Sequence, residues 1–424
     1  MASRRIFLKN GALALFAVGV GGVPTFISRA AESRKLRSLY KKNKILICIF
    51  QRGAMDGLMA VTPFEDQYLQ KARPLLFMSA AKTASKPLID LDGRFGLHPS
   101  MSAFENLFKE KRLAIVHGVG SPNTTRSHFD AQDYMESGTP FNKGTNSGWL
   151  NRAVGLLGHE TPTPFQAVSL TTSLPRSFYG DNAVVAISNL ADFTIQLKGN
   201  PMGANTAAKS FEELYDKTSS DLLSKTGKES FEAMKILKTA DVKNYQPSNG
   251  AVYPVSPLGN SLKQIAQLIK MDVGMEIAFA ECGGWDTHYN QGAETGTFSR
   301  NVADLSGAIT AFWTDMGQQY QDDVEVMTMT EFGRTVHQNG SNGTDHGRAS
   351  CMFILGNDVN GGAVYGKVPE LAIENLEDKR DLPVTTDFRA VFNEVATAHL
   401  KIKDNGQLFP DWKGERMGII KQVI

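Results

Sequence analysis

The sequence predicts a layered α/β fold, because short apolar runs alternate with amphipathic stretches along the chain. The apolar runs are four to seven residues long, which suits buried strands better than helices. The sequence shows no internal repeat and no long low-complexity linker. With 424 residues, the chain is long enough for one large α/β domain with insertions or for two ordinary domains.

Six apolar runs are the candidate strands. They are Ile45–Phe50, Leu113–His117, Phe165–Leu170, Met275–Ala280, Val324–Thr330 and Met352–Leu355. Apolar residues recur at helical spacing from Leu262 to Ile269 and from Val302 to Met316, which predicts helices that pack one face onto the sheet. Residues 189–250 are polar and helix-prone, with no strand signal until Tyr253, and we interpret them as a helical insertion or cap.

The first thirty residues have the composition of an export signal. Paired arginines at positions 4 and 5 precede Phe-Leu-Lys, and an uncharged run then ends in small residues around Ala30. This pattern resembles a twin-arginine signal, so we expect residues 1–30 to be cleaved after passage through the twin-arginine translocase. A retained anchor is the alternative, but ~17 residues reach only about 25 Å of a hydrocarbon layer of about 30 Å. The expected location is therefore periplasmic or secreted, without a stable membrane span.

Charge and cysteine content exclude several classes of protein. Removal of residues 1–30 takes away four basic residues and no acidic one, so the formal net charge moves from +1 to −3. A mildly acidic protein is a poor candidate for binding the phosphate backbone of nucleic acid. Cys48, Cys282 and Cys351 lie in or beside apolar runs without the spacing of a disulfide framework or a zinc ribbon, which indicates buried thiols.

Polar residues that directly follow predicted strands are the candidate site residues, because ligands of open α/β sheets bind beyond the carboxyl ends of the strands. The first cluster is Gln51–Gly57, a glycine-rich turn that places the carboxylate of Asp56 beside the sheet. An Asp-Gly turn that only reverses the chain explains these residues equally well.

The second cluster, Gly118–Asp130, leads from a strand into a helix expected to begin near Ser127. The Ser127 hydroxyl is either an ordinary helix N-cap or a nucleophile whose anionic ligand binds at the positive end of the helix dipole. Arg126 favours the second interpretation, because arginine can make a bidentate contact with a tetrahedral anion.

The third and fourth clusters contain two Asp-His pairs. Asp286 and His288 are two residues apart in an extended segment, so their side chains point to the same side and can bind one cation. Glu331 ends a strand, Arg334 follows it, and a glycine-rich loop then leads to Asp345 and His346. A surface loop is the alternative for each pair, whereas His337 and His98 are interpreted as surface or packing residues.

The four clusters in this order resemble a family of exported bacterial proteins, domain-of-unknown-function family 1501. The resemblance extends from about Lys44 to the C-terminus and depends on the strings around Asp56, Ser127-His128-Phe129, Gly284–His288 and Thr344–Gly347. The family is similar to the alkaline phosphatase and sulfatase superfamily, whose members hold two divalent cations at the strand ends. The resemblance implies one alkaline-phosphatase-like domain over residues 44–424, with three α/β/α layers, a mostly parallel central sheet and a helical insertion.

The resemblance also implies roles by position. The implied metal ligands are Asp56, Asp286, His288, Glu331, Asp345 and His346. Ser127 matches the region of the nucleophile, and Phe332 occupies the place of a histidine in the superfamily's Asp-His-Gly triplet. Because of Phe332 and the close spacing of Asp286 and His288, the second metal site is expected to be weakened or absent. The resemblance implies a divalent cation, with zinc, manganese, calcium and magnesium as the candidates.

The predicted activity is hydrolysis or transfer of a phosphate or sulfate ester on a small-molecule or polymer substrate. Ser127 would attack the ester, and Arg126 or Arg334 would neutralise its equatorial oxygens. A non-catalytic envelope or surface-polymer binding protein with an eroded metal site is the main alternative. A serine hydrolase is disfavoured, because adjacent Ser127 and His128 cannot generally form the nucleophile–base hydrogen bond and no Gly-x-Ser-x-Gly motif is present.

Overall fold

A nine-stranded sheet forms the centre of the fold. The computed structural model describes residues 43–159, 163–190, 244–404 and 406–421. Within them the strand order is β13-β5-β12-β9-β1-β8-β6-β7, with β14 also paired to β5. Only β12 runs antiparallel to its neighbours, β5 and β9, among the strands of this described sheet. The strands are β1 Ile45–Gln51, β5 Leu113–Gly120, β6 Ala167–Ser169, β7 Val185–Ala186, β8 Ile277–Cys282, β9 Val324–Met329, β12 Ser350–Gly356, β13 Val364–Tyr365 and β14 Thr386–Asp387.

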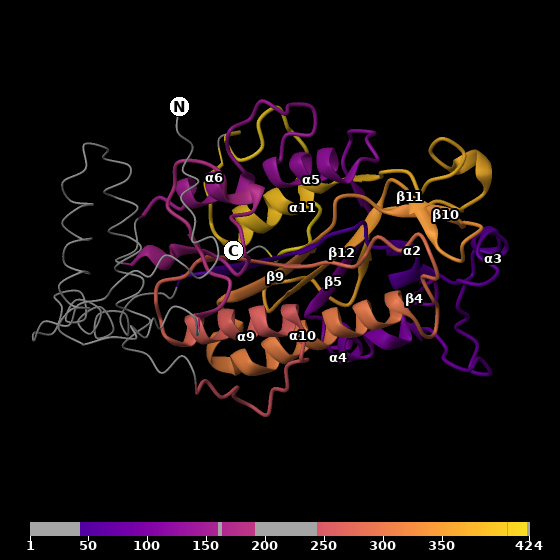
Figure 1. Ribbon diagram of the computed structural model, residues 1–424, viewed down its shortest axis with the longest axis horizontal. Coiled ribbons are helices and arrows are strands. Elements are labelled where there is room, and N and C mark those ends of the chain that lie inside the picture. Colours follow the sequence, from indigo (N-terminus) through magenta and orange to yellow (C-terminus); the bar gives the residue numbers. More distant parts are fainter. Residues whose placement is uncertain (1–42, 160–162, 191–243, 405, 422–424) are drawn as a thin grey trace, which may run out of the picture.

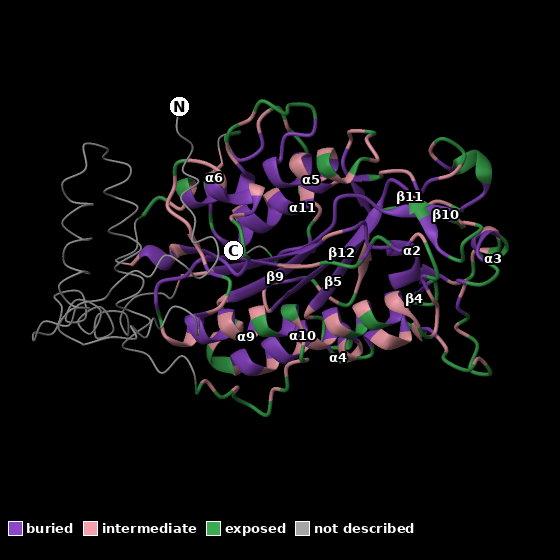
Figure 2. Ribbon diagram, in the orientation of Figure 1, coloured by how far each residue is buried: buried purple, intermediate pink, exposed green. Residues whose placement is uncertain are grey.

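Helices cover both faces of the sheet, as Figure 1 shows. On one face lie α4 (Ala103–Lys109), α9 (Pro257–Lys270) and α10 (Thr297–Gln321), and on the other lie α5 (His128–Ser137), α6 (Trp149–Leu156) and α11 (Phe388–Glu394). Side chains alternate across β1, so that Ile45, Ile47 and Ile49 join one apolar core and the intervening residues join the other. The sheet is therefore buried on both faces (Figure 2). The predicted three-layer α/β/α class with a mostly parallel sheet is confirmed.

All six predicted strands are present, as are the two helices predicted to pack on the sheet and the helix expected to begin near Ser127. The predicted signal peptide, residues 1–30, and most of the predicted insertion, residues 191–243, lie outside the described residues. In the described ranges, no helix combines the length and the apolar character needed to cross a bilayer. Cys48 and Cys351 are buried and Cys282 is partly buried, and all three are free thiols.

Smaller elements lie around the carboxyl edge of the sheet. The segment after β1 forms α2 (Gly57–Ala60), β2 (Val61–Pro63) and α3 (Gln67–Ala72), and β2 pairs with β4 (Phe95–Leu97), which also pairs with β3 (Ile89–Asp90). After β9 the chain forms an antiparallel pair, β10 (Arg334–Gln338) and β11 (Thr344–His346). Because β1, β8 and β9 are parallel neighbours, the loops that follow them meet at one edge.

Two glycines allow these loops to approach one another closely. Gly53 has φ +115°, and a Cβ there would lie 2.6 Å from the backbone nitrogen of Asp286. A Cβ on Gly343 would lie 2.4 Å from the carbonyl carbon and oxygen of His288. Both loops therefore pack backbone against backbone beside the Asp286 to His288 segment.

Two further histidines, which pack against these smaller elements, are buried and neutral at pH 7. His117 Nε2–H donates to Val61 O at 3.0 Å, and its Nδ1 accepts from Gly118 N–H at 2.9 Å. His98 has the same arrangement, with Ala293 O as acceptor and Ser100 N–H as donor. Burial lowers the pKa of both imidazoles to about 4.

We expect Gly343→Ala to lower the free energy of unfolding by about 1–3 kcal/mol, because the new methyl group must displace the backbone of His288. Urea unfolding measures this change. Gly340→Ala is the matched control, since nothing lies within 4 Å of a Cβ at that glycine, and it should change stability by less than about 0.5 kcal/mol. Equal effects of the two substitutions would contradict the close approach.

The lowered histidine pKa values predict a loss of stability in acid. Each imidazole has a pKa of about 6.5 in the unfolded state and of about 4 in the folded state. The contribution of each neutral histidine to the free energy of unfolding is therefore complete above pH 6.5 and is lost as the pH falls from 6.5 towards 4. Between pH 7 and pH 5, each should remove about 2 kcal/mol from the free energy of unfolding. His117→Gln should reduce this decline by that amount, whereas His337→Gln, at an exposed position, should leave it unchanged.

Candidate metal centre

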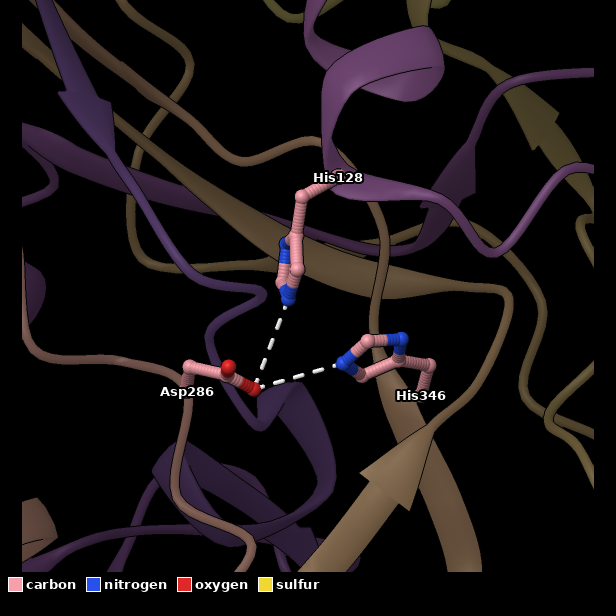
Figure 3. A group of neighbouring side chains, drawn as sticks. All are labelled: His128, Asp286 and His346. Carbon is pink, nitrogen blue, oxygen red and sulfur yellow. Dashed lines mark hydrogen bonds and ion pairs between the residues drawn. The ribbon is translucent and has the colours of Figure 1, made fainter.

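Three histidines from different elements surround one carboxylate oxygen of Asp286. His128 is the first residue of α5, His346 is the last residue of β11, and His288 lies in the loop after β8 together with Asp286. Asp286 Oδ1 lies 3.4 Å from His128 Nε2, 3.0 Å from His288 Nε2 and 3.3 Å from His346 Nε2. Figure 3 shows the imidazoles of His128 and His346 pointing at this oxygen.

The other ring nitrogen of each imidazole is held by an acceptor. His128 Nδ1 lies 2.8 Å from Glu331 Oε1, and His288 Nδ1 lies 2.9 Å from Asp345 Oδ1. His346 Nδ1 lies 2.8 Å from the carbonyl oxygen of Arg126. Since ionised carboxylates and carbonyl groups only accept hydrogen bonds, each Nδ1 carries a proton, and Nε2 is the atom that each imidazole can offer to a cation.

These donor atoms fit a metal ion. His128, Asp286 and His346 each offer a ligand atom, all within 4.8 Å of one another, and His288 Nε2 lies 2.8 Å from His346 Nε2. Donors bound at about 2.0–2.2 Å to a common cation lie about 3–3.5 Å apart, close to the separations around Asp286 Oδ1. His128 Nε2 is buried and has no hydrogen-bond partner among the described residues.

Negative charge accumulates around the imidazoles. Burial is the largest single effect on Asp286 and works against its ionisation, but the hydrogen bond and charge of Arg334, with His288 and His128, together outweigh it and lower the pKa of Asp286. Burial also opposes ionisation of Glu331, whose pKa is lowered by hydrogen bonds from His128, Gln132 and backbone N–H groups. The pKa of Asp345 is lowered chiefly by the hydrogen bond from Asn339. Three ionised carboxylates therefore surround the cluster at neutral pH.

Arg334 does not lie where a substrate can reach it, contrary to the predicted anion-binding role. Its side chain is 0% exposed. It donates to the carbonyl oxygens of Ala54, Gly53, Trp285 and Thr344 and, at 2.6 Å, to Asp286 Oδ1. All of its nitrogens are engaged, so Arg334 neutralises Asp286 and joins the loops.

Asp56 also has a different environment from the one predicted. Its buried carboxylate pairs with Arg73 at 2.9 Å, accepts from Gln291 at 2.7 Å and caps α2 through Met59 N–H. Arg73 in turn donates to the carbonyl oxygens of Thr335 and Val336 on β10. Asp56 thus joins the segment after β1 to the hairpin and is not among the grouped ligand atoms.

The other predicted site residues divide into two groups. The side chains that lie together as predicted are those of Asp286, His288 and His346. The carboxylates of Glu331 and Asp345 instead accept hydrogen bonds from the imidazoles of His128 and His288. Ser127 is the exposed N-cap of α5, and its hydroxyl makes no hydrogen bond within the described part of the chain. The guanidinium of Arg126 pairs with Asp378 and Asp381, so its charge is already neutralised.

Sequence reasoning missed His128 as a ligand. His128 stacks on Phe332, with ring centroids 5.0 Å apart and planes at 29°, and Phe332 also contacts the ring of His346. Phe332 therefore forms an apolar support beneath two imidazoles, and Glu331 beside it holds His128. The available signal was the position of His128 at the start of a helix in the second cluster, where it was weighed only as a base for Ser127.

Comparisons with known proteins give weak structural matches. Similar solved structures include a sulfatase from Pseudoalteromonas sp., with 9% identity, coverage of 95% of this chain and 78% of that chain, and a TM-score of 0.39. Another is the C-terminal periplasmic domain of EcEptC from Escherichia coli, in complex with Zn, with 8% identity, coverage of 74% and 73%, and a TM-score of 0.33. A third is alkaline phosphatase from the Antarctic bacterium TAB5, with 12% identity, coverage of 75% and 93%, and a TM-score of 0.30.

At these scores the structural matches assign no activity to this chain. No curated protein matches the sequence. One family profile, described as "Protein of unknown function (DUF1501)", matches residues 43–411, which is most of the chain. The order of the four clusters had already pointed to the same family. The chain therefore belongs to the DUF1501 family.

Proposed function

We propose that this protein is an exported, metal-dependent hydrolase or transferase that acts on phosphate or sulfate esters. The observation that supports the proposal most is the convergence of three Nε2 atoms on Asp286 Oδ1, with each Nδ1 held by a separate acceptor. Imidazole–carboxylate sets suit zinc or manganese better than calcium or magnesium, which prefer oxygen ligands. Export by the twin-arginine route to the periplasm or beyond is part of the proposal and rests on residues 1–30.

The residues of the proposed site would have three roles: binding the cation, orienting the imidazoles and attacking the ester. His128, His288, His346 and Asp286 hold the cation, while Glu331 and Asp345 fix the imidazoles. A cation held there supplies Lewis acidity toward an ester oxygen and lowers the pKa of a nearby hydroxyl. The exposed Ser127 hydroxyl, one residue before His128, is the proposed nucleophile: its oxygen forms a bond to phosphorus or sulfur as the bond to the leaving-group oxygen breaks, and its proton passes through solvent to that leaving group. Water or an acceptor hydroxyl then takes the group from the esterified serine and restores the serine hydroxyl.

One observation favours a second function. Arg126 and Arg334, the two cations predicted to bind the ester's oxygens, are both neutralised by carboxylates of the protein. A non-catalytic protein that binds an envelope component or a surface polymer, and that keeps only part of the metal chemistry, breaks no ester bond and so needs no free arginine. The two functions differ in turnover and share the metal.

Metal content tests what both functions share. Gently purified protein should contain about one zinc or manganese ion per chain, and His128→Ala or His346→Ala should weaken binding about tenfold or more, because each removes a ligand. Elemental analysis and calorimetric titration measure these effects. His337→Ala is the matched control, since this exposed histidine should bind no metal. Wild-type protein that binds neither ion would contradict the metal centre.

Turnover separates the two functions. Metal-loaded protein should hydrolyse a member of a panel of chromogenic phosphomonoesters, phosphodiesters and sulfate esters, and Ser127→Ala should lower kcat about a hundredfold or more by removing the nucleophile. Thr124→Ala is the control, because Thr124 is an exposed hydroxyl in the same loop. Metal binding without turnover of any ester would favour the binding protein over the enzyme.

A further inference from the structure

The short segment Glu377–Asp381 contacts His346 by two routes. Arg380 Nη2 donates to the carbonyl oxygen of His346 at 2.6 Å. On the other side, His346 Nδ1–H donates to the carbonyl oxygen of Arg126, whose guanidinium donates to Asp381 Oδ2 through Nε at 2.9 Å and Nη2 at 2.6 Å. The segment therefore contacts the backbone of His346 and, through Arg126, its imidazole.

Asp381 is the centre of this arrangement. Its side chain is 0% exposed, and its other oxygen accepts from Arg380 Nε at 3.1 Å. Its backbone N–H donates to Glu377 O, and its backbone forms a bridge with Thr335 on β10. Asp378, the second partner of Arg126, is 62% exposed and makes only a solvent-screened ion pair.

We propose that Asp381 is a positioning residue for the metal ligand His346. By holding the guanidinium of Arg126, Asp381 fixes the carbonyl oxygen that accepts the Nδ1–H of His346, and so directs Nε2 toward Asp286. The inference rests on the proposed metal centre and gives Arg126 a use other than anion binding. His128 and His288 have carboxylates as their acceptors, whereas His346 has a neutral carbonyl that needs this additional support.

The physical reason is the second hydrogen bond of a metal-bound imidazole. That bond sets the tautomer and the ring orientation, and its loss typically weakens metal binding by about 10–100-fold. A carbonyl oxygen in the extended segment before α5 can move when the side chain of its own residue is released. The buried carboxylate of Asp381 prevents this movement through two hydrogen bonds to one guanidinium.

The test compares Asp381→Asn with Asp378→Asn, using Co²⁺ as the probe. Both substitutions remove one negative charge opposite Arg126, but only the first removes the buried partner. We expect Asp381→Asn to weaken Co²⁺ binding about 10–100-fold and to change the visible absorption of the bound ion, because the ligand geometry changes. Asp378→Asn should bind Co²⁺ within about twofold of the wild type and keep its spectrum.

A second variant keeps the test independent of the folding of Asp381→Asn. Arg126→Gln retains the backbone carbonyl but loses the guanidinium, so it should show the same loss, and the double variant should lose little more than either single variant. Wild-type affinity and spectrum in folded Asp381→Asn or Arg126→Gln would overturn the inference, as would an equal loss in Asp378→Asn. Failure of the wild type itself to bind Co²⁺ would instead contradict the proposed metal centre.

Discussion

The buried guanidinium of Arg334 holds the three loops that form the site. It donates to Gly53 and Ala54 after β1, to Trp285 and Asp286 after β8, and to Thr344 on β11. A buried charge is tolerated only when its hydrogen bonds are made and its charge is balanced, and removal of one partner of such a pair typically costs about 3–5 kcal/mol. Arg334 meets both conditions through five acceptors, one of which is the carboxylate at the centre of the cluster.

This constraint also decides the chemistry of the ligands. Arg334 Nη1 lies 3.4 Å from His288 Nε2, and because a guanidinium only donates, this nitrogen too presents a lone pair. Glu331 and Asp345 fix the tautomers of His128 and His288, and Arg126 O fixes that of His346. The loops therefore bring the histidines together with each Nδ1–H held by an acceptor and each Nε2 directed at Asp286. Such pre-organisation lowers the cost of binding a cation.

Much of the fold was predictable because strand burial leaves a strong pattern. Runs such as Ile45–Phe50 are apolar at every position, since both faces of the sheet are covered, and the paired residues Asp286 and His288 follow such a run directly. The position of a carboxylate after a strand, by contrast, does not predict which residue it will contact. Asp56 and Glu331 occupy similar positions in the sequence, yet one pairs with Arg73 and the other holds His128, and those partners carry no sequence pattern that links them.

The role of His128 was also not predictable from the sequence, because its partners are distant along the chain. Its position beside Ser127 suggested a catalytic base, whereas its real contacts, Glu331 and Phe332, lie more than two hundred residues away in the chain. They come together in the folded chain, where Ala131 on α5 packs with Phe332 in one small apolar cluster.

The most direct test of the metal centre is anomalous X-ray diffraction from crystals of the zinc- or manganese-loaded protein. The proposed metal centre predicts one strong peak at about 2.0–2.3 Å from Asp286 Oδ1 and from the Nε2 atoms of His128, His288 and His346. A loaded crystal whose anomalous signal lies elsewhere, or in which these four side chains show no peak between them, would contradict it.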